Sequence, residues 1–425
     1  MTIRSRGILC SLVALLGTPQ PSRAGEREPP RPYLMLVTFS APRLRAWTPQ
    51  TLGMLNASPF AGVASTVIGG YETDPVPELS EFQYAVAAIR KGAKCDVWPW
   101  VFTNRFMGRG TRSHTSAGKV APEYFKGIKG WDLSNRAGAQ ADFFKIWRLA
   151  LILAREIEAP GVVLDMEAYN SYESYSLPKL AEYEGLTEAE TVQKRRGLGR
   201  RMAQVAAAEY PQAVIWSLFL QFGQQSSTRY LIEGMLDEAK ENAIPLKLVE
   251  GGESSVGYYN PSIEALRQRL QSQSADLAPW LAEYPDHLRL GGTISPYHDP
   301  KRLTSWIKRT SETGGRTYQN AREFRPLFDQ LFASCEYLWI YAASASGYSP
   351  FNDKCRPVWE PIHAELSALY PKWRAAYRLL PFPRVPQEPR LRERPREFHA
   401  LPVAPESWLK GDPKTDLRQG EVTLG

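Results

Sequence analysis

The sequence predicts a (β/α)8 barrel with enlarged loops and a proline-rich C-terminal extension. Eight short runs of apolar, β-branched or aromatic residues recur between residues 33 and 342, and helical patterns separate several of them. Several runs lack apolar–polar alternation, as expected for strands buried on both faces of a parallel sheet. Eight strands alternating with helices over about 320 residues match a closed barrel. An open, doubly wound sheet is the main alternative, but no Gly-x-Gly-x-x-Gly follows the first run, which disfavours its dinucleotide-binding form.

The expected strands follow one another at regular intervals. They lie at residues 33–39, 63–68, 95–102, 161–165, 213–219, 247–250, 288–293 and 337–342. The helix expected at 141–157 has Phe144, Trp147 and Leu151 at helical spacing, and Pro211 ends the helix at 188–210 just before the fifth strand. Further helices are expected at 261–272, 301–309 and 322–332.

Composition and charge describe a soluble globular protein with a real core. Of the 425 residues, 43% are hydrophobic and 23% are charged, which excludes a disordered chain or a polytopic membrane protein. The net charge of +7 lies at the two ends. Residues 1–24 hold three arginines and no acid, residues 371–425 hold eleven Lys or Arg against seven Asp or Glu, and residues 25–370 are neutral. We therefore do not expect nucleic acid or another polyanion as a partner.

Residues 1–24 have the pattern of a secretory signal peptide. Arg4 and Arg6 precede an apolar run over residues 8–16, and Ser22-Arg23-Ala24 has the small residues of a cleavage site. We expect cleavage near Ala24 and a secreted or periplasmic protein. The apolar run is roughly half the length that spans a bilayer, and a short N-terminal anchor is the alternative. No other stretch reaches transmembrane length, so no integral membrane span is expected.

The rest of the chain divides into a barrel and a tail. Residues 25–370 are expected to form the catalytic barrel, and residues 371–425 an extended strap or disordered tail, because eight prolines between 381 and 413 leave no room for a helix or a central strand. In an oxidising compartment Cys335 and Cys355 could pair and leave Cys95 as a buried thiol. The sequence leaves that pairing and the oligomeric state open.

The strongest chemical signal follows the fourth expected strand. Residues 161–167 run from apolar side chains directly into Asp165 and Glu167. Because strand side chains alternate, these two carboxylates should point the same way, opposite to Leu164 and Met166. In a barrel they would face inward at the C-terminal mouth, where active sites lie. Proximity and partial burial should raise the pKa of one of them, as a general acid requires. The alternative is that both cap the next loop or pair with arginines.

A second acidic cluster follows the sixth expected strand. Glu250 and Glu253 flank Gly251 and Gly252, and glycines beside a carboxylate let a ligand approach the backbone. Cleavage of a glycosidic bond usually needs two carboxyl groups across that bond. Glu250 or Glu253 could therefore oppose the pair after the fourth strand, or the cluster could be a flexible acidic turn.

Aromatic residues gather near the expected strand ends, where flat rings suit the C–H faces of sugars. We expect the substrate-binding residues to be Trp98, Trp100, Tyr169, Tyr297, His298 and Trp339. No metal site and no cofactor are expected, because the chain has five histidines without His-x-His or His-Glu-x-x-His spacing, no Cys-x-x-Cys and no phosphate-binding loop. Gly-x-Ser-x-Gly is also missing, which disfavours an α/β-hydrolase.

These residues resemble the TIM-barrel glycoside hydrolase superfamily. The resemblance lies in the strand ending in Asp165-Met166-Glu167 and in the Trp-bearing last strand at 337–341. Chitinase-like members end their fourth strand in Asp-x-x-Asp-x-Asp-x-Glu, whose last Glu is the proton donor. Here only the final Asp-x-Glu matches, and Pro160 and Val163 occupy the earlier aspartate positions. Other members pair a fourth-strand Asp nucleophile with an acid on a later strand, which would combine Asp165 with Glu250 or Glu253.

The sequence favours an exported glycoside hydrolase acting on an oligo- or polysaccharide. Glu167 would be the general acid/base, Asp165 would orient it or act as nucleophile, and Glu250 or Glu253 would be the opposing carboxylate. A non-catalytic carbohydrate-binding barrel at the cell surface is one alternative, since it needs the aromatics but not the acids. A barrel hydrolase with a divalent ion held by Asp165, Glu167 and His298 is another.

Overall fold

The computed structural model describes residues 32–38, 41–68, 76–102, 137–167, 176–258, 260–295 and 321–342, together with seven residues between 350 and 367. All of them belong to one compact unit, Arg31–Gly425. The expected signal peptide and the expected C-terminal strap lie outside the described residues. Within the described part of the chain, no helix is both long and apolar enough to cross a bilayer.

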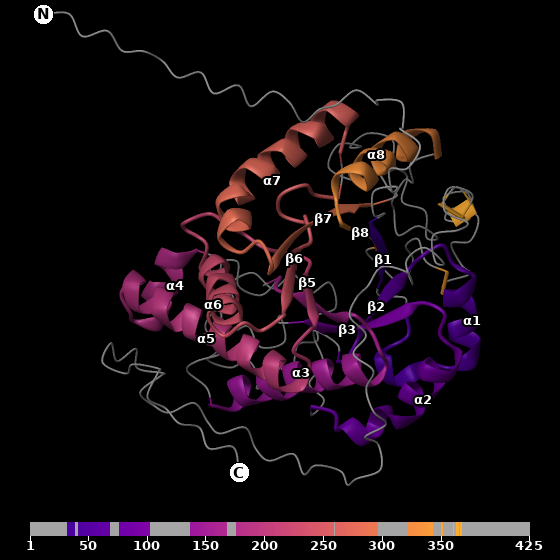
Figure 1. Cartoon of the computed structure of the whole chain (residues 1–425), viewed down its shortest axis with the longest axis horizontal. Helices are drawn as coiled ribbons and strands as arrows, with labels where there is room; N and C mark the ends of the chain where they lie inside the picture. Colours follow the sequence, from indigo (N-terminus) through magenta and orange to yellow (C-terminus); the bar gives the residue numbers. More distant parts are fainter. Residues whose placement is uncertain are drawn as a thin grey trace, which may run out of the picture. The chain divides into compact units, whose positions relative to one another are not determined.

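Eight parallel strands close into a barrel in which each strand pairs with its neighbours in sequence and β1 pairs with β8 (Figure 1). The strands are β1 (Tyr33–Thr38), β2 (Gly62–Thr66), β3 (Asp96–Phe102), β4 (Gly161–Asp165), β5 (Val214–Ser217), β6 (Lys247–Glu250), β7 (Leu288–Ile294) and β8 (Tyr337–Ala342). Each lies within two residues of its expected position at either end. The (β/α)8 barrel is therefore confirmed, and the open sheet is excluded by the β1–β8 pairing.

Helices are placed around the strands (Figure 1). They are η1 (Leu44–Ala46), α1 (Pro49–Ala57), η2 (Leu79–Phe82), α2 (Gln83–Gly92), α3 (Ala137–Glu156), α4 (Leu177–Glu184), α5 (Glu188–Glu209), α6 (Ser227–Glu241), α7 (Ile263–Glu283) and α8 (Ala321–Ser334). The helices expected at 141–157, 188–210 and 322–332 are confirmed. The expected helix at 261–272 continues to Glu283 because Leu277 and Trp280 extend its buried face. The expected helix at 301–309 lies outside the described residues.

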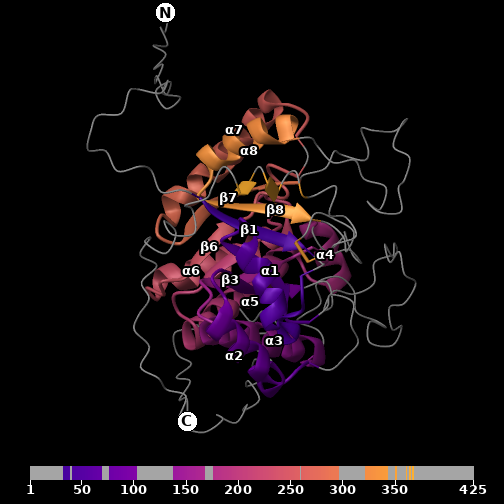
Figure 2. The ribbon, with the colours of Figure 1, turned by 90° about the vertical axis from the view of Figure 1, so that its right-hand side faces the viewer.

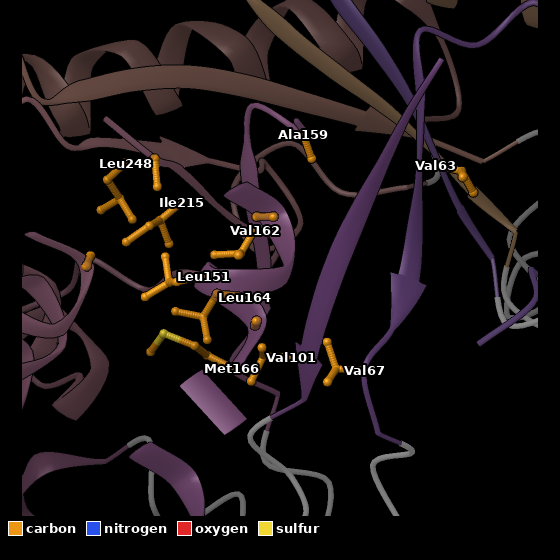
Figure 3. Close-up of a cluster of buried hydrophobic side chains, with 14 of the residues drawn as sticks. Val63, Val67, Val101, Leu151, Ala159, Val162, Leu164, Met166, Ile215 and Leu248 are labelled. Atoms are coloured by element: carbon orange, nitrogen blue, oxygen red, sulfur yellow. The ribbon is translucent and has the colours of Figure 1, made fainter. Parts of the chain in front are cut away.

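Strand side chains alternate between two apolar layers. The outer layer lies between strands and helices, and in Figure 3 Val162, Leu164 and Met166 lie there beside Leu151 of α3. The inner layer fills the barrel and includes Val163 of β4. This alternation fixes which face each residue near the end of β4 presents, because the side-chain period of a strand is two.

The barrel interior is rich in aromatic rings. The ring centroids of Tyr33 and Trp98 lie 5.5 Å apart, those of Trp98 and Trp216 5.8 Å apart, and those of Trp216 and Tyr337 5.2 Å apart, all edge to face. The indole Nε1 of Trp98 donates to the Tyr33 hydroxyl over 2.8 Å, and that hydroxyl donates to Asp96. Trp98 is fully buried. The structure thus assigns Trp98 to the core, not to the sugar subsite expected from the sequence.

Helices α7 and α8 cover one side of the barrel. They pack on each other and on β7, and Figure 2 shows them beside β7 and β8, whose neighbour β1 runs in the same direction. Cys335, just after α8, lies in this outer layer as a free thiol. Its Sγ is 2.7 Å from the point that a Cβ on Gly292 would occupy, so the thiol packs closely against the β7 backbone. Cys355 lies outside the described residues.

Candidate active site

Asp165 is the last residue of β4 and lies at the C-terminal mouth of the barrel. It follows the inward-facing Val163 by two positions, and its side chain is only 3% exposed. Its Oδ1 accepts the backbone N–H of Glu167 over 3.0 Å. Burial raises the pKa of Asp165 well above its usual value, and the charge of Glu253 raises it further, against the Glu167 amide and a polar contact from the Trp100 indole.

Glu253 reaches the same place from the loop after β6. The Gly251 amide donates to the Ser217 carbonyl over 2.8 Å, and the Glu253 amide donates to the Leu218 carbonyl over 3.3 Å. The loop therefore crosses the end of β5, which pairs with β4. A Cβ on Gly251 would lie 2.5 Å from the Ser217 oxygen, and Gly252 has a φ of 83°. The two glycines thus allow backbone to pack on backbone, where the sequence suggested that they allow a ligand to approach.

Glu167 and Glu253 form a carboxyl pair. Their side chains are in hydrogen-bonding contact, which requires that one of them holds a proton. Burial raises the pKa of Glu167 well above its usual value, and the charges of Glu253 and Asp165 raise it further. Burial also raises the pKa of Glu253, but hydrogen bonds from Glu167 and Tyr258 oppose that rise. Of the two carboxyl groups, Glu167 therefore has the more strongly raised pKa.

Glu250 lies on the opposite face of β6 from this pair. Val249 points into the barrel, so Leu248 and Glu250 point outward, and Glu250 pairs in register with Leu290 of β7. Its carboxyl accepts from Gln273 of α7 and from the Gly252 amide, the latter over 2.9 Å. Of the two acids that the sequence left open, Glu253 is thus the one that lies beside Asp165 and Glu167. Strand alternation turns Glu250 away from the mouth.

Aromatic rings border the carboxyl cluster. Tyr258 and Tyr341 stack with centroids 4.1 Å apart and an angle of 15° between planes, and both are half-buried. Trp339 lies edge-on to Tyr258 at 5.4 Å, and its indole donates to the Gly251 carbonyl over 2.6 Å. Trp339 and Trp100 are almost fully buried, so they pack against the cluster inside the barrel. Neither presents an open ring face.

Tyr258 belongs to this cluster but was not among the site residues expected from the sequence. Its hydroxyl hydrogen-bonds to Glu253, and burial and the charge of Glu253 raise the pKa of that hydroxyl. Only its position, eight residues after the end of β6 at Glu250, could have pointed to it. The expected ligand contacts Tyr169, Tyr297 and His298 lie outside the described residues. Among the residues that are described, no three His, Cys, Asp or Glu side chains are grouped as metal ligands.

Comparison with known proteins finds similarity in structure only. No protein-family model matches the sequence, and no curated protein matches it significantly. Solved structures that match include a GH18 chitinase, ChiB, from Flavobacterium johnsoniae (TM-score 0.35, 10% identity, 80% of this chain and 96% of that one). The PgaB glycoside hydrolase domain from Bordetella bronchiseptica also matches (0.39, 12%, 73% and 94%), as does an old yellow enzyme homologue from Zymomonas mobilis (0.35, 8%, 73% and 84%).

Two of these three structures are glycoside hydrolases by name and one is not. At these TM-scores and identities the similarity has no bearing on activity. The barrel topology of this chain is established by its own strand pairing.

Proposed function

We propose that this protein is a glycoside hydrolase that cleaves an oligo- or polysaccharide by acid/base chemistry of its carboxyl groups. The observation that carries the proposal is the buried contact between Glu167, whose pKa burial and neighbouring charges raise strongly, and Glu253, whose pKa rise is opposed by hydrogen bonds, beside Asp165 at the barrel mouth. Hydrolysis near neutral pH needs a carboxylic acid that still holds its proton and a carboxylate that has lost it. Here burial and the repulsion between neighbouring carboxylates produce this difference in pKa.

Each carboxyl group has a separate role in the proposed reaction. Glu167 donates its proton to the glycosidic oxygen, and Glu253 is the opposing carboxylate. Asp165 orients Glu167 by accepting its backbone N–H, and it is a second candidate for the nucleophile. Carboxyl groups in hydrogen-bonding contact are nearer than the roughly 5–9.5 Å of glycosidase pairs. A bound sugar would therefore separate Glu167 from Glu253, and Glu253 would hold the proton donor in place until then.

The aromatic border suits a sugar ring. Stacked Tyr258 and Tyr341 combine apolar surface with hydroxyl groups that can bind sugar hydroxyls. The hydroxyl of Tyr258 is engaged by Glu253, so sugar binding and carboxylate position are linked at one residue. Trp98 has no part in binding because the core encloses it.

We further propose that the protein is exported. The support is the basic, apolar and small-residue pattern of residues 1–24. N-terminal sequencing of the protein recovered from the medium or periplasm of an expressing bacterium should begin at Gly25. A chain that keeps Met1 and remains in the cytoplasm would contradict the export proposal without affecting the catalytic one.

A screen for reducing ends tests the proposed activity. Wild-type protein is incubated with a panel of soluble β- and α-linked glucans, mannans, xylans, chitosans and chitin oligosaccharides, with and without EDTA. We expect reducing ends to be released from at least one glycan. EDTA should not affect this release, and Glu253→Gln should strongly reduce it. The matched control, Glu182→Gln on the exposed face of α4, should behave as wild type.

The other outcomes separate the alternatives. Binding to a glycan in affinity electrophoresis without release from any panel member would favour the non-catalytic carbohydrate-binding barrel. Release that EDTA abolishes and Mn²⁺ or Ca²⁺ restores would favour the barrel hydrolase with a divalent ion. Unchanged release by Glu253→Gln would exclude Glu253 as the opposing carboxylate.

A further inference from the structure

Glu250 is a buried acid that the proposed chemistry does not use. Its side chain is fully buried under α7, on the outer face of the barrel. Three donors surround it, namely the Gly252 amide at 2.9 Å, the Ser255 hydroxyl at 3.3 Å from each carboxyl oxygen, and the Gln273 amide. Two of the three donors belong to the loop after β6. A carboxyl group is rarely buried this fully unless it is paired or hydrogen-bonded.

The loop that Glu250 holds is the one that carries Glu253 and Tyr258. Within the loop, the amides of Val256 and Gly257 both donate to the Gly252 carbonyl over 2.8 Å. From outside, Arg269 of α7 donates to the Val256 carbonyl over 2.8 Å. Gln273 donates to the Gly291 carbonyl of β7 over 3.1 Å as well as to Glu250. The carboxyl of Glu250 therefore joins the loop to α7 and, through Gln273, to β7.

We propose that Glu250 is a positioning residue: its buried carboxyl group anchors the loop that carries Glu253 and Tyr258, and its ionisation loosens that loop. When Glu250 is neutral, its O–H can donate to Ser255 while its oxygens accept from Gly252 and Gln273, so its buried polar atoms all have hydrogen-bond partners. Ionised Glu250 is a charge on the apolar side of the sheet, and it gains solvation when the loop opens. The consequence for hydrolysis depends on the proposed function, but the anchoring itself does not.

The surroundings of Glu250 favour its neutral form in the closed loop. Burial raises its pKa to about 7, although the donors from Gln273, Gly252 and Ser255 lower it. The titratable groups that face it are Glu253 on the loop and the Cys335 thiol after α8. Burial raises the pKa of that thiol to about 12, so it stays neutral while Glu250 titrates. Glu253 is therefore the group whose titration a test must separate from that of Glu250.

Hydrogen–deuterium exchange of the full-length protein, without any sugar, tests the proposal. Exchange of peptides covering residues 251–258 is measured from pH 5 to 9 and corrected for the intrinsic chemical rate. In the wild type we expect the protection of these amides to fall about tenfold as the pH rises through about 7, because the buried charge of ionised Glu250 gains solvation when the loop opens. Peptides of β1 serve as the internal reference.

Three variants test whether the fall in protection with pH comes from the ionisation of Glu250. Glu250→Gln, which keeps a neutral side chain of the same size, should lose the step and stay protected at pH 9. Gln273→Met removes a donor that favours the ionised form, so the step should move to higher pH. Glu253→Gln should keep the step.

A purely structural role for Glu250 would give a difference between wild type and Glu250→Gln that does not change with pH. That result, a flat wild-type profile, or a step that survives in Glu250→Gln or disappears in Glu253→Gln would overturn the proposal. Because no sugar is present, none of these results bears on whether the protein is a hydrolase.

Discussion

Replacement of Glu250 by glutamine should make the protein more stable at alkaline pH. The pKa of Glu250 rises from 4.5 to about 7 on folding because the fold buries the carboxyl group. The native state therefore holds a proton that the unfolded state releases between these values. The stabilisation from this proton is complete below pH 4.5 and is lost as the pH rises through about 7. Linkage converts the rise in pKa into about 3 kcal/mol of unfolding free energy.

Urea unfolding of wild type and Glu250→Gln at pH 4 and pH 8.5 measures this term. Asp165 and Glu167 also have raised pKa values, but their contributions are present in both proteins and cancel in the difference. The charge of Glu253 interacts with Glu250, so the same comparison is repeated in the Glu253→Gln background. Glutamine brings a hydrogen-bond mismatch of about 1 kcal/mol that does not change with pH. The stability of the variant relative to wild type should therefore rise by about 3 kcal/mol between the two pH values. A relative stability that is constant or falls with pH would refute the reasoning.

Three further outcomes follow from the same geometry. Gly252→Ala should lower the free energy of unfolding in urea by about 2 kcal/mol or more, because φ is 83° and the new Cβ would lie 3.0 Å from a backbone carbon of β7. Gly197→Ala, in open space on α5, should raise it by up to about 1 kcal/mol. Equal effects of the two changes would contradict the strained loop. Tyr258→Phe removes a hydrogen bond that lowers the pKa of Glu253, so the acidic limb of the pH–rate profile should move to higher pH, and an unmoved limb would exclude that contact. EDTA should leave turnover unchanged, and its inhibition would point to a metal.

The barrel could be predicted from the sequence because its strands are short apolar runs whose burial dominates local propensity. The missed helices α1, α2 and α4 span only eight to ten residues each, so each displays few apolar repeats, whereas α6 was missed although its buried residues recur along 15 residues. Helix α7 passes through a proline that packing overrides. Helix boundaries depend on such tertiary contacts, which a single sequence does not display.

Part of the candidate site could be predicted in the same way. The alternation of residues 163–167 placed Asp165 and Glu167 correctly, because it depends only on strand geometry. The same rule, applied to Val249 and Glu250, would have turned Glu250 outward. Glu253 and Tyr258 depend on the path of a loop, which two glycines and the carbonyl of Ser217 determine. Such a path is set by backbone contacts that leave no periodic pattern.

The proton on Glu167 is the centre of the proposed chemistry, and the turnover of Glu167→Gln tests it most directly. The change is almost isosteric and leaves an amide that cannot protonate a leaving group. On the glycan that the wild type cleaves fastest, we predict a loss of at least about 10²-fold in kcat, with glycan binding and thermal unfolding retained and with Glu182→Gln unchanged. Wild-type turnover by Glu167→Gln would contradict the proposed role of the carboxyl cluster.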